Sequence, residues 1–210
     1  MAVNYIIKAD VIDITVDSPK KGDIFLVDTN VWYWLTYPPA SLSAQLYQST
    51  SYPNYIESTV TVGATLCYSG LSLAELAHRI ESEEHKLSPY GSTSDPNYRQ
   101  RAKEYRHNYP SERAKVVFQV QAVWNQIESI YAAQIDLTLN KATVDATVTR
   151  FSTQCLDGYD LFILESMKQE SLTKIITDDG DYVTVPDIQV FTANQRVIRE
   201  AKQQKKLIKR

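Results

Sequence analysis

Acidic side chains stand at places in this chain where a carboxylate needs an explanation. Asp28 closes the apolar run "FLVD", and Asp179 and Asp181 follow the apolar "KII" of "KIITDDGD". Glu75 in "LSLAELAHRI" and Asp160 in "LDGYDLFILESM" lie among apolar residues of two expected helices. Burying an unpaired negative charge is costly or forces the group to take up a proton. We therefore expect these acids to have a cation, a hydrogen-bond network or water beside them.

Each of these acids alone also has an ordinary explanation. A glutamate beside an apolar stripe is usually solvated, and an aspartate at a strand end usually serves a turn or a helix N-cap. Asp157 is a good N-cap for the helix that carries Asp160, so Asp160, one turn further in, is left without that role. Only the acids taken together favour a shared site.

Carboxylates held close together repel one another and raise each other's pKa unless a divalent cation neutralises them. The motifs offer oxygen ligands, which favour Mg²⁺ or Mn²⁺ over Zn²⁺. Such ions activate a water and stabilise the leaving oxygen in an in-line displacement at phosphorus. The sequence therefore indicates metal-dependent hydrolysis of phosphodiester bonds.

The second half of the chain alternates between helical and strand patterns, which predicts a parallel α/β sheet. We expect helices over 111–133, 141–154 and 157–171, strands over 134–140, 174–179 and 187–194, and a basic terminal helix. In such sheets the functional crevice lies outside the carboxyl ends of the strands. Acids that follow strands would meet there.

The first half contains the remaining elements that must position the acids. An alternating, Ile- and Val-rich pattern predicts a strand within 4–17, and "IFLVDTN" predicts a more buried strand at 24–30. A helical stripe predicts a helix over 71–87. The segment 37–58 suggests a short helix, 59–70 fits either a strand or the start of a helix, and 88–98 reads as a loop.

At 210 residues the chain is long enough for one good core, and we expect a single domain over 1–210. Its parts are an N-terminal extension strand in 1–23, a basic insert at about 85–115, and a basic helix or tail in 196–210. No apolar stretch is long enough to span a membrane, and the start lacks the layout of a signal peptide, so we expect a cytoplasmic protein. The two cysteines form no C-x-x-C pair, so no disulfide framework or thiolate zinc site is implied.

The net charge of −3 does not indicate nucleic-acid binding by itself, but the basic residues gather in two stretches, "RQRAKEYRHNYPSERAK" and "AKQQKKLIKR". In the first, Arg99, Arg101 and Arg106 interleave with tyrosines. This pattern fits a solvated helix with ordinary ion pairs. It also fits a surface that binds the phosphates and unstacked bases of single-stranded RNA.

Four segments resemble, in order and spacing, the acidic motifs of PIN-domain ribonucleases: "FLVDTNVW", "LSLAELAHRI", "GYDLFILESMKQ" and "IITDDGDY". The resemblance spans roughly residues 24 to 195, and Thr177, Asp179, Asp181 and Tyr182 fall on the family's T-x-D-x-D-aromatic signature. It implies a PIN-like three-layer α/β fold and a Mg²⁺- or Mn²⁺-dependent endoribonuclease. The implied metal-binding and catalytic acids are Asp28, Glu75, Asp160 and Asp179, with Asp181 as a further metal-site acid and Thr29, Asn30 and Thr177 as supporting residues.

The chain also departs from the family pattern. An extra strand precedes the first motif, and the gap between Glu75 and Asp160 is a few tens of residues longer than usual. The resemblance implies RNA, single-stranded or structured, as substrate, with 5′-phosphate and 3′-hydroxyl products because water is the nucleophile. It leaves open whether the protein is a toxin with an antitoxin partner, a processing enzyme or a decay factor, and whether it forms a homodimer.

Three other functions compete with this hypothesis. The pairs Glu75-x-x-His78 and Glu104-x-x-His107 match a ferritin-like di-iron protein, but the second pair lies in a segment without an apolar stripe. A haloacid-dehalogenase-like phosphatase would need a second aspartate where this chain has Asn30. A PIN-like module that binds RNA or protein without catalysis is the third alternative.

Overall fold

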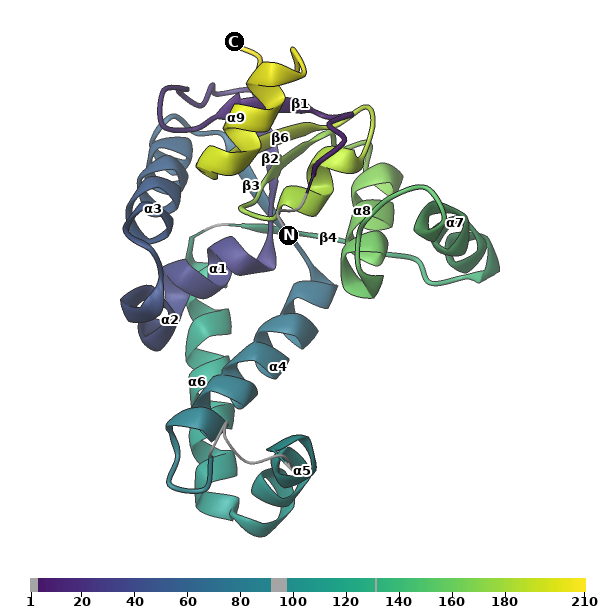
Figure 1. The fold of residues 1–210 in the computed structure, drawn as a ribbon. Coiled ribbons are helices and arrows are strands. Elements are labelled where there is room, and N and C mark those ends of the chain that lie inside the picture. The colour runs from purple at the N-terminus through teal and green to yellow at the C-terminus, as the bar shows by residue number, and fades with distance from the viewer. Residues whose placement is uncertain (1–3, 92–97, 131) are drawn as a thin grey trace.

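The computed structural model describes residues 4–91, 98–130 and 132–210, with the side chains of 98–100 left out. Its centre is a six-stranded sheet of order β1-β6-β5-β2-β3-β4 in which every neighbouring pair is parallel (Figure 1). The strands are β1 (Asp10–Asp13), β2 (Ile24–Val27), β3 (Thr65–Ser69), β4 (Ala133–Ile135), β5 (Lys174–Ile176) and β6 (Gln189–Thr192). The α/β fold with a mainly parallel sheet is therefore confirmed, and β1 is the expected extra N-terminal strand.

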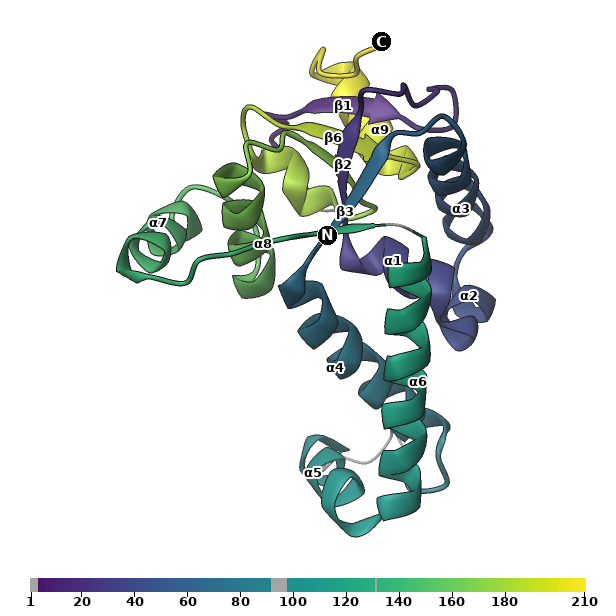
Figure 2. The same ribbon diagram turned by 180° about the vertical axis from the view of Figure 1, so that it is seen from behind.

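Helices cover both faces of the sheet, because successive strand residues point to opposite sides. Phe25 and Val27 pack under α1 (Thr29–Thr36) and α3 (Leu46–Thr61), whereas Leu26, between them, packs under α8 (Gly158–Gln169) on the other face. The second face is completed by the 3₁₀ helix η1 (Gly180–Thr184) and by α9 (Gln195–Gln203). The shorter helices α2 (Pro38–Ser43) and α7 (Lys141–Phe151) lie outside these layers (Figure 2).

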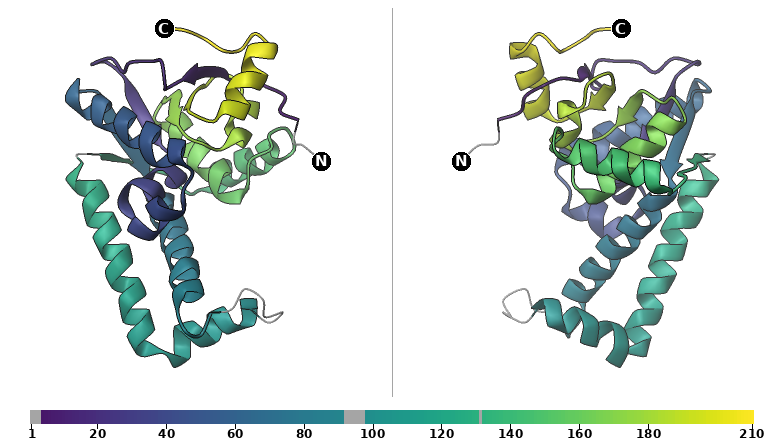
Figure 3. Two further views of the ribbon diagram at one scale, coloured as in Figure 1. Left: turned by 60° about the vertical axis from the view of Figure 1, so that its left-hand side comes forward. Right: turned by 90° about the vertical axis from the view of Figure 1, so that its right-hand side faces the viewer.

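Two long helices form an arm that projects from the sheet. They are α4 (Gly70–Leu87) and α6 (Pro110–Ser129), and α5 (Tyr98–Asn108) lies between them in sequence, at the far end of the arm (Figure 3). Leu76 and Ile80 of α4 and Val123 and Ile127 of α6 are buried in the same hydrophobic cluster as α1. The arm is thus anchored to the core at its base, and α5 is the expected helical insert.

The order of the strands reverses at the centre of the sheet. The chain goes from β2 to β3 and β4 on one side, then returns across β2 to β5 and β6 on the other. Strand β2 therefore lies between β3 and β5, and the connections that leave the carboxyl ends of β2 and β5 diverge there. Such a switch point is where a parallel sheet opens a crevice.

Several element boundaries differ from the sequence expectation. The strand expected within 4–17 is only four residues long, because the backbone N–H groups of Lys8 and Ala9 donate to Val183 O of η1 instead of extending a ladder. The ambiguous segment 59–70 is split by Gly63, whose positive φ ends α3 and leads into β3. Helix α6 ends at Ser129, not at Ala133, because Ala133 pairs with Cys67 in the sheet.

The remaining differences are small. The segment 37–58 forms two helices, α2 and most of α3, instead of one short helix. Strands β4, β5 and β6 are each shorter than expected, whereas the basic terminal helix is confirmed as α9. None of the helices in the described ranges is both long and apolar enough to cross a membrane.

Candidate metal centre

Three carboxylates from three different elements meet at the carboxyl edge of the sheet. Asp28 directly follows β2 and caps α1, Glu75 lies in the second turn of α4, and Asp160 lies in the first turn of α8. Each offers one ligand atom, and these atoms all lie within 4.8 Å of one another. Helices α1 and α4 begin where the adjacent strands β2 and β3 end, which brings Asp28 and Glu75 to one edge.

Three hydrogen bonds hold the Asp28 carboxylate. The backbone N–H of Thr29 donates to Oδ1 at 2.6 Å, and Asn30 Nδ2 and Thr177 Oγ1 donate to Oδ2 at 2.7 Å and 2.5 Å. Thr177 follows β5, so this network joins the ends of β2 and β5 across the switch point. Burial raises the pKa of Asp28 to about 7, with the charges of Glu75 and Asp179 adding to the shift and the Thr177 bond opposing it.

The carboxylate of Asp160 accepts a hydrogen bond from the hydroxyl of Tyr182, at 3.0 Å to Oδ1. Asp157 caps α8 through the N–H groups of Tyr159 and Asp160, as the sequence predicts. Burial, together with the charges of Asp28, Asp157 and Asp179, raises the pKa of Asp160 to about 8. Two buried acids with raised pKa values in one cluster are typical of a functional site.

The two carboxylate oxygens of Glu75 have different surroundings. Its Oε1 accepts from Arg79 Nε at 3.0 Å and Nη2 at 2.9 Å, one helical turn away. Its Oε2 is buried and has no hydrogen-bond partner in the described part of the chain. A buried oxygen left unpaired carries a desolvation cost that a bound cation would remove. This oxygen and the two aspartates fit the all-oxygen ligand set of Mg²⁺ or Mn²⁺.

Asp179 and Asp181 lie beside the cluster but outside the group of three. Asp179 caps η1 by accepting from the backbone N–H of Asp181 at 2.8 Å, and its own N–H donates to Thr177 Oγ1 at 2.9 Å. Its charge contributes to the raised pKa values of both Asp28 and Asp160. Burial and the charge of Asp179 raise the pKa of Asp181. Their roles as metal ligands remain predictions.

The neighbouring acid, Asp178, belongs to a different network. Its carboxylate accepts hydrogen bonds from the hydroxyls of Tyr47 and Tyr52 and from Nε2 of Gln48, all on α3. This aspartate therefore ties the loop after β5 to α3. Asn30 and Thr177 donate hydrogen bonds to Asp28. The Thr29 hydroxyl is buried without a partner among the described residues, so Thr29 contributes through its backbone N–H.

Two residues that contact the cluster are not among those predicted from the sequence to support it. Tyr182 is the aromatic residue of the last motif, and its buried hydroxyl orients Asp160. Arg79 pairs with Glu75, and a spacing of four residues on a helix is the ordinary sequence signal for such a pair.

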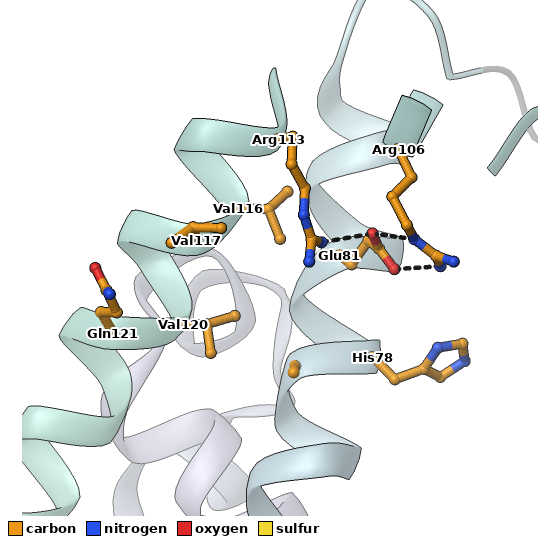
Figure 4. Close-up of a pocket in the computed structure, with 9 residues that line it drawn as sticks. His78, Glu81, Arg106, Arg113, Val116, Val117, Val120 and Gln121 are labelled. Atoms are coloured by element: carbon orange, nitrogen blue, oxygen red, sulfur yellow. Dashed lines mark hydrogen bonds and ion pairs between the residues drawn. The ribbon is translucent and has the colours of Figure 1, made fainter. Parts of the chain in front are cut away.

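The three arginines expected to bind RNA have different settings. Arg106 forms a two-point ion pair with Glu81 of α4, at 2.8 Å and 2.6 Å (Figure 4). Arg101 is exposed on α5, and the side chain of Arg99 lies outside the described residues. Glu104 and His107 are also on α5 at the end of the arm, and the parallel sheet replaces the four-helix bundle that a di-iron protein requires.

Comparisons with known proteins assign the chain to no family. No family model matches the sequence, and no curated protein does. Among solved structures, a chain in the crystal structure of VapBC2 from Rickettsia felis bound to a DNA fragment from their promoter is similar, with 17% sequence identity and a TM-score of 0.47. The match covers 80% of this chain and 98% of that chain.

Proposed function

We propose that this protein is a Mg²⁺- or Mn²⁺-dependent ribonuclease that hydrolyses phosphodiester bonds at the Asp28, Glu75 and Asp160 cluster. The observation that carries the proposal is the convergence of these three carboxylates at the switch point of the sheet. Two of them have raised pKa values and the third has a buried oxygen without a partner in the described part of the chain. RNA as the substrate rests on the resemblance of the acidic motifs to PIN-domain ribonucleases.

In this mechanism the protein side chains position the ligand oxygens and the water. Asn30 and Thr177 fix Asp28, Tyr182 fixes Asp160, and Arg79 fixes one oxygen of Glu75 so that the other is available to an ion. A bound divalent ion would supply Lewis-acid activation of water and neutralise charge that develops on the phosphate. Asp179 and Asp181, at the edge of the cluster, are proposed as additional acids for a second ion or its waters.

The biological partner is a further proposal. Toxin, processing enzyme and decay factor all use the same chemistry, and the motif resemblance is compatible with each. A toxin role would require an antitoxin protein as partner, and such a partner is one proposal for this chain. A small gene adjacent to the gene for this protein would favour the toxin role over the other two.

The decisive test is the variant Asp28→Asn assayed on a labelled single-stranded oligoribonucleotide. Removal of one ligand oxygen should lower the cleavage rate in Mg²⁺ or Mn²⁺ by at least about 100-fold. The parent should lose activity in excess EDTA and give 5′-phosphate ends. Ca²⁺, which is larger and differently coordinated, should support binding with little turnover.

Asp145→Asn is the matched control, because Asp145 is an exposed acid on α7 that pairs only with Lys141 in the described structure. It should cleave like the parent. Full activity of Asp28→Asn at saturating Mn²⁺, or equal cleavage with and without EDTA, would refute the proposed metal site.

A further inference from the structure

A hollow of about 420 Å³ lies on the arm, between α4 and α6 and beside α5. Arg113 of α6 and Arg106 of α5 extend over it toward Glu81 of α4, while Val117 and Val120 form an apolar wall on the α6 side (Figure 4). The sequence placed Arg106 in a basic stretch, but only the tertiary structure brings it together with Arg113. The hollow is separate from the acidic cluster.

The charges in this hollow do not cancel. Arg106 donates from Nε and Nη2, and Arg113 donates from Nη1, so both guanidinium groups share the single carboxylate of Glu81. Two positive charges against one negative charge leave a net charge of +1. Each guanidinium has five N–H donors, and most of these ten are left without an acceptor in the described part of the chain.

The carboxylate of Glu81 holds the two guanidinium groups in place. Its side chain is 13% exposed, whereas those of Arg106 and Arg113 are each 44% exposed. The hydrogen bond from Arg106, with the charges of Arg106, Arg113 and His78, holds the pKa of Glu81 below its ordinary value against the effect of burial. The carboxylate therefore stays ionised and keeps two solvent-facing guanidinium groups in fixed positions, which lowers the entropy cost of binding an anion.

The position of the hollow on α4 relates it to the acidic cluster. Glu75, His78 and Glu81 are spaced by three residues and follow one i+3 ridge of the helix. The helical rise places Glu81 about 9 Å along the axis from Glu75. His78 is exposed and lines the hollow between them. An extended strand bound at the acidic cluster could therefore follow this ridge toward the two arginines.

We propose that Arg106 and Arg113 form an anion subsite that binds a backbone phosphate of single-stranded RNA next to the bond being cut. The inference rests on the proposed ribonuclease function and adds a binding determinant on the arm. Paired guanidinium groups suit phosphate recognition. The valine wall suits the face of an unstacked base, which single-stranded RNA presents and a folded duplex does not.

The test measures binding of a labelled single-stranded oligoribonucleotide to the full chain in Ca²⁺ across a salt series. Arg113→Gln removes one cation and keeps the two-point Arg106–Glu81 pair that joins α5 to α4. Loss of one phosphate contact should reduce the slope of log K against log salt by about 0.7. Lys141→Gln, on exposed α7, is the matched control and should give a line parallel to that of the parent.

Glu81→Gln is an independent test, because this variant should bind RNA more tightly, whereas Arg113→Gln should bind it less tightly. If the arginines bind phosphate, removing the competing carboxylate should tighten RNA binding at every salt concentration. If they serve only to join the helices, the variant should leave binding unchanged and lower the melting temperature. Circular dichroism establishes whether Glu81→Gln keeps its helices, and Arg113→Gln alone decides the question if it does not.

Parallel lines for Arg113→Gln and the parent would overturn the subsite, as would a folded Glu81→Gln that binds no more tightly. Failure of the parent to bind the oligonucleotide would overturn it as well. Cleavage of the same oligonucleotide in Mn²⁺ by the parent, compared with Asp28→Asn, reports on the ribonuclease function separately. A parent that cleaves, with an unchanged slope in Arg113→Gln, would refute the subsite and leave the proposed function standing.

Discussion

At the scale of single residues, Asp28 and Asp160 are the carboxyl groups whose ionisation the fold disturbs most plainly. Burial raises their pKa values to about 7 and about 8, whereas an aspartate in an unfolded chain titrates near about 3.9. Between these values the folded protein binds more protons than the unfolded chain. The stability that this provides is complete below about pH 4 and is lost as the pH rises through about 7 and 8.

Metal-free protein should therefore become less stable between about pH 4 and about pH 8, as measured by urea unfolding in EDTA. Asp160→Asn should flatten this dependence and raise stability by roughly 2 kcal/mol near pH 8. The amide oxygen can still accept from Tyr182, and the amide nitrogen can donate to the neighbouring carboxylates. The same variant should lose the stabilisation that Mn²⁺ gives the parent. If stability depended on pH in the same way in both proteins, burial could not be raising the pKa of Asp160.

At the scale of elements, α4 and α6 of the arm pack into the hydrophobic core at one end. Toward the other end, ion pairs to Glu81 join α5 and α6 to α4. Ile127 of α6 is fully buried in the cluster that contains Trp32 of α1 and Phe25 of β2. Leu76 and Ile80 of α4 are buried in the same cluster, and the hydroxyl of Tyr37, at the end of α1, donates to Glu84 in the last turn of α4 at 2.6 Å. The base of the arm is thus continuous with the sheet, so α4 carries Glu75 on a rigid support.

Ile127→Ala should lower the free energy of unfolding by about 2 to 5 kcal/mol, because it removes buried methylene groups and leaves a cavity at the base of α6. Phe118→Ala on the same helix is the control: Phe118 is 67% exposed, so its effect should stay within about 0.5 kcal/mol. Guanidinium unfolding measures both. Equal effects of the two substitutions would mean that α6 does not share the core.

At the scale of the whole molecule, Arg210 joins distant parts of the chain. Its guanidinium donates to Asp17 and Asp23, in the loop between β1 and β2, and lies 4.6 Å from the ring of Phe191. The preceding residues pair with β1, where Ile208 N–H donates to Val11 O at 2.8 Å. This tail therefore completes the β1 edge of the sheet.

Arg210→Ala should cost about 3 kcal/mol or more at neutral pH, because it leaves two nearly buried carboxylates without this partner. Burial alone would raise the pKa of Asp23, but Lys174, the Lys20 N–H and Arg210 outweigh it and hold the pKa below its ordinary value. The stabilisation is present above the unfolded pKa and is lost as the pH falls, so the difference between the proteins should shrink in acid.

Lys209→Ala is the matched control, since Lys209 is exposed beside Arg210 in the chain and its removal should change little. Thermal unfolding of the three proteins at neutral and acidic pH provides the comparison. A cost for Arg210→Ala that is the same at both pH values would show that the contact with the Phe191 ring, and not the ion pairs, carries the effect.

The sequence by itself determined the features that depend on local pattern. The alternation of helical and strand patterns predicted the parallel α/β sheet, and the apolar run before Asp28 predicted the place of Asp28 at a strand end. Capping chemistry distinguished Asp157 from Asp160. These predictions hold because burial period and end-capping are decided by residues a few positions apart.

Only the tertiary structure decided which polar groups meet. Asp28, Glu75 and Asp160 converge because the order of the parallel strands reverses at β2, and no local pattern encodes the distance between the three carboxylates. The same holds for Asp178, which faces α3, and for Arg106, which shares Glu81 with Arg113. Contacts between residues far apart in sequence depend on how whole elements pack, and packing is a property of the complete fold.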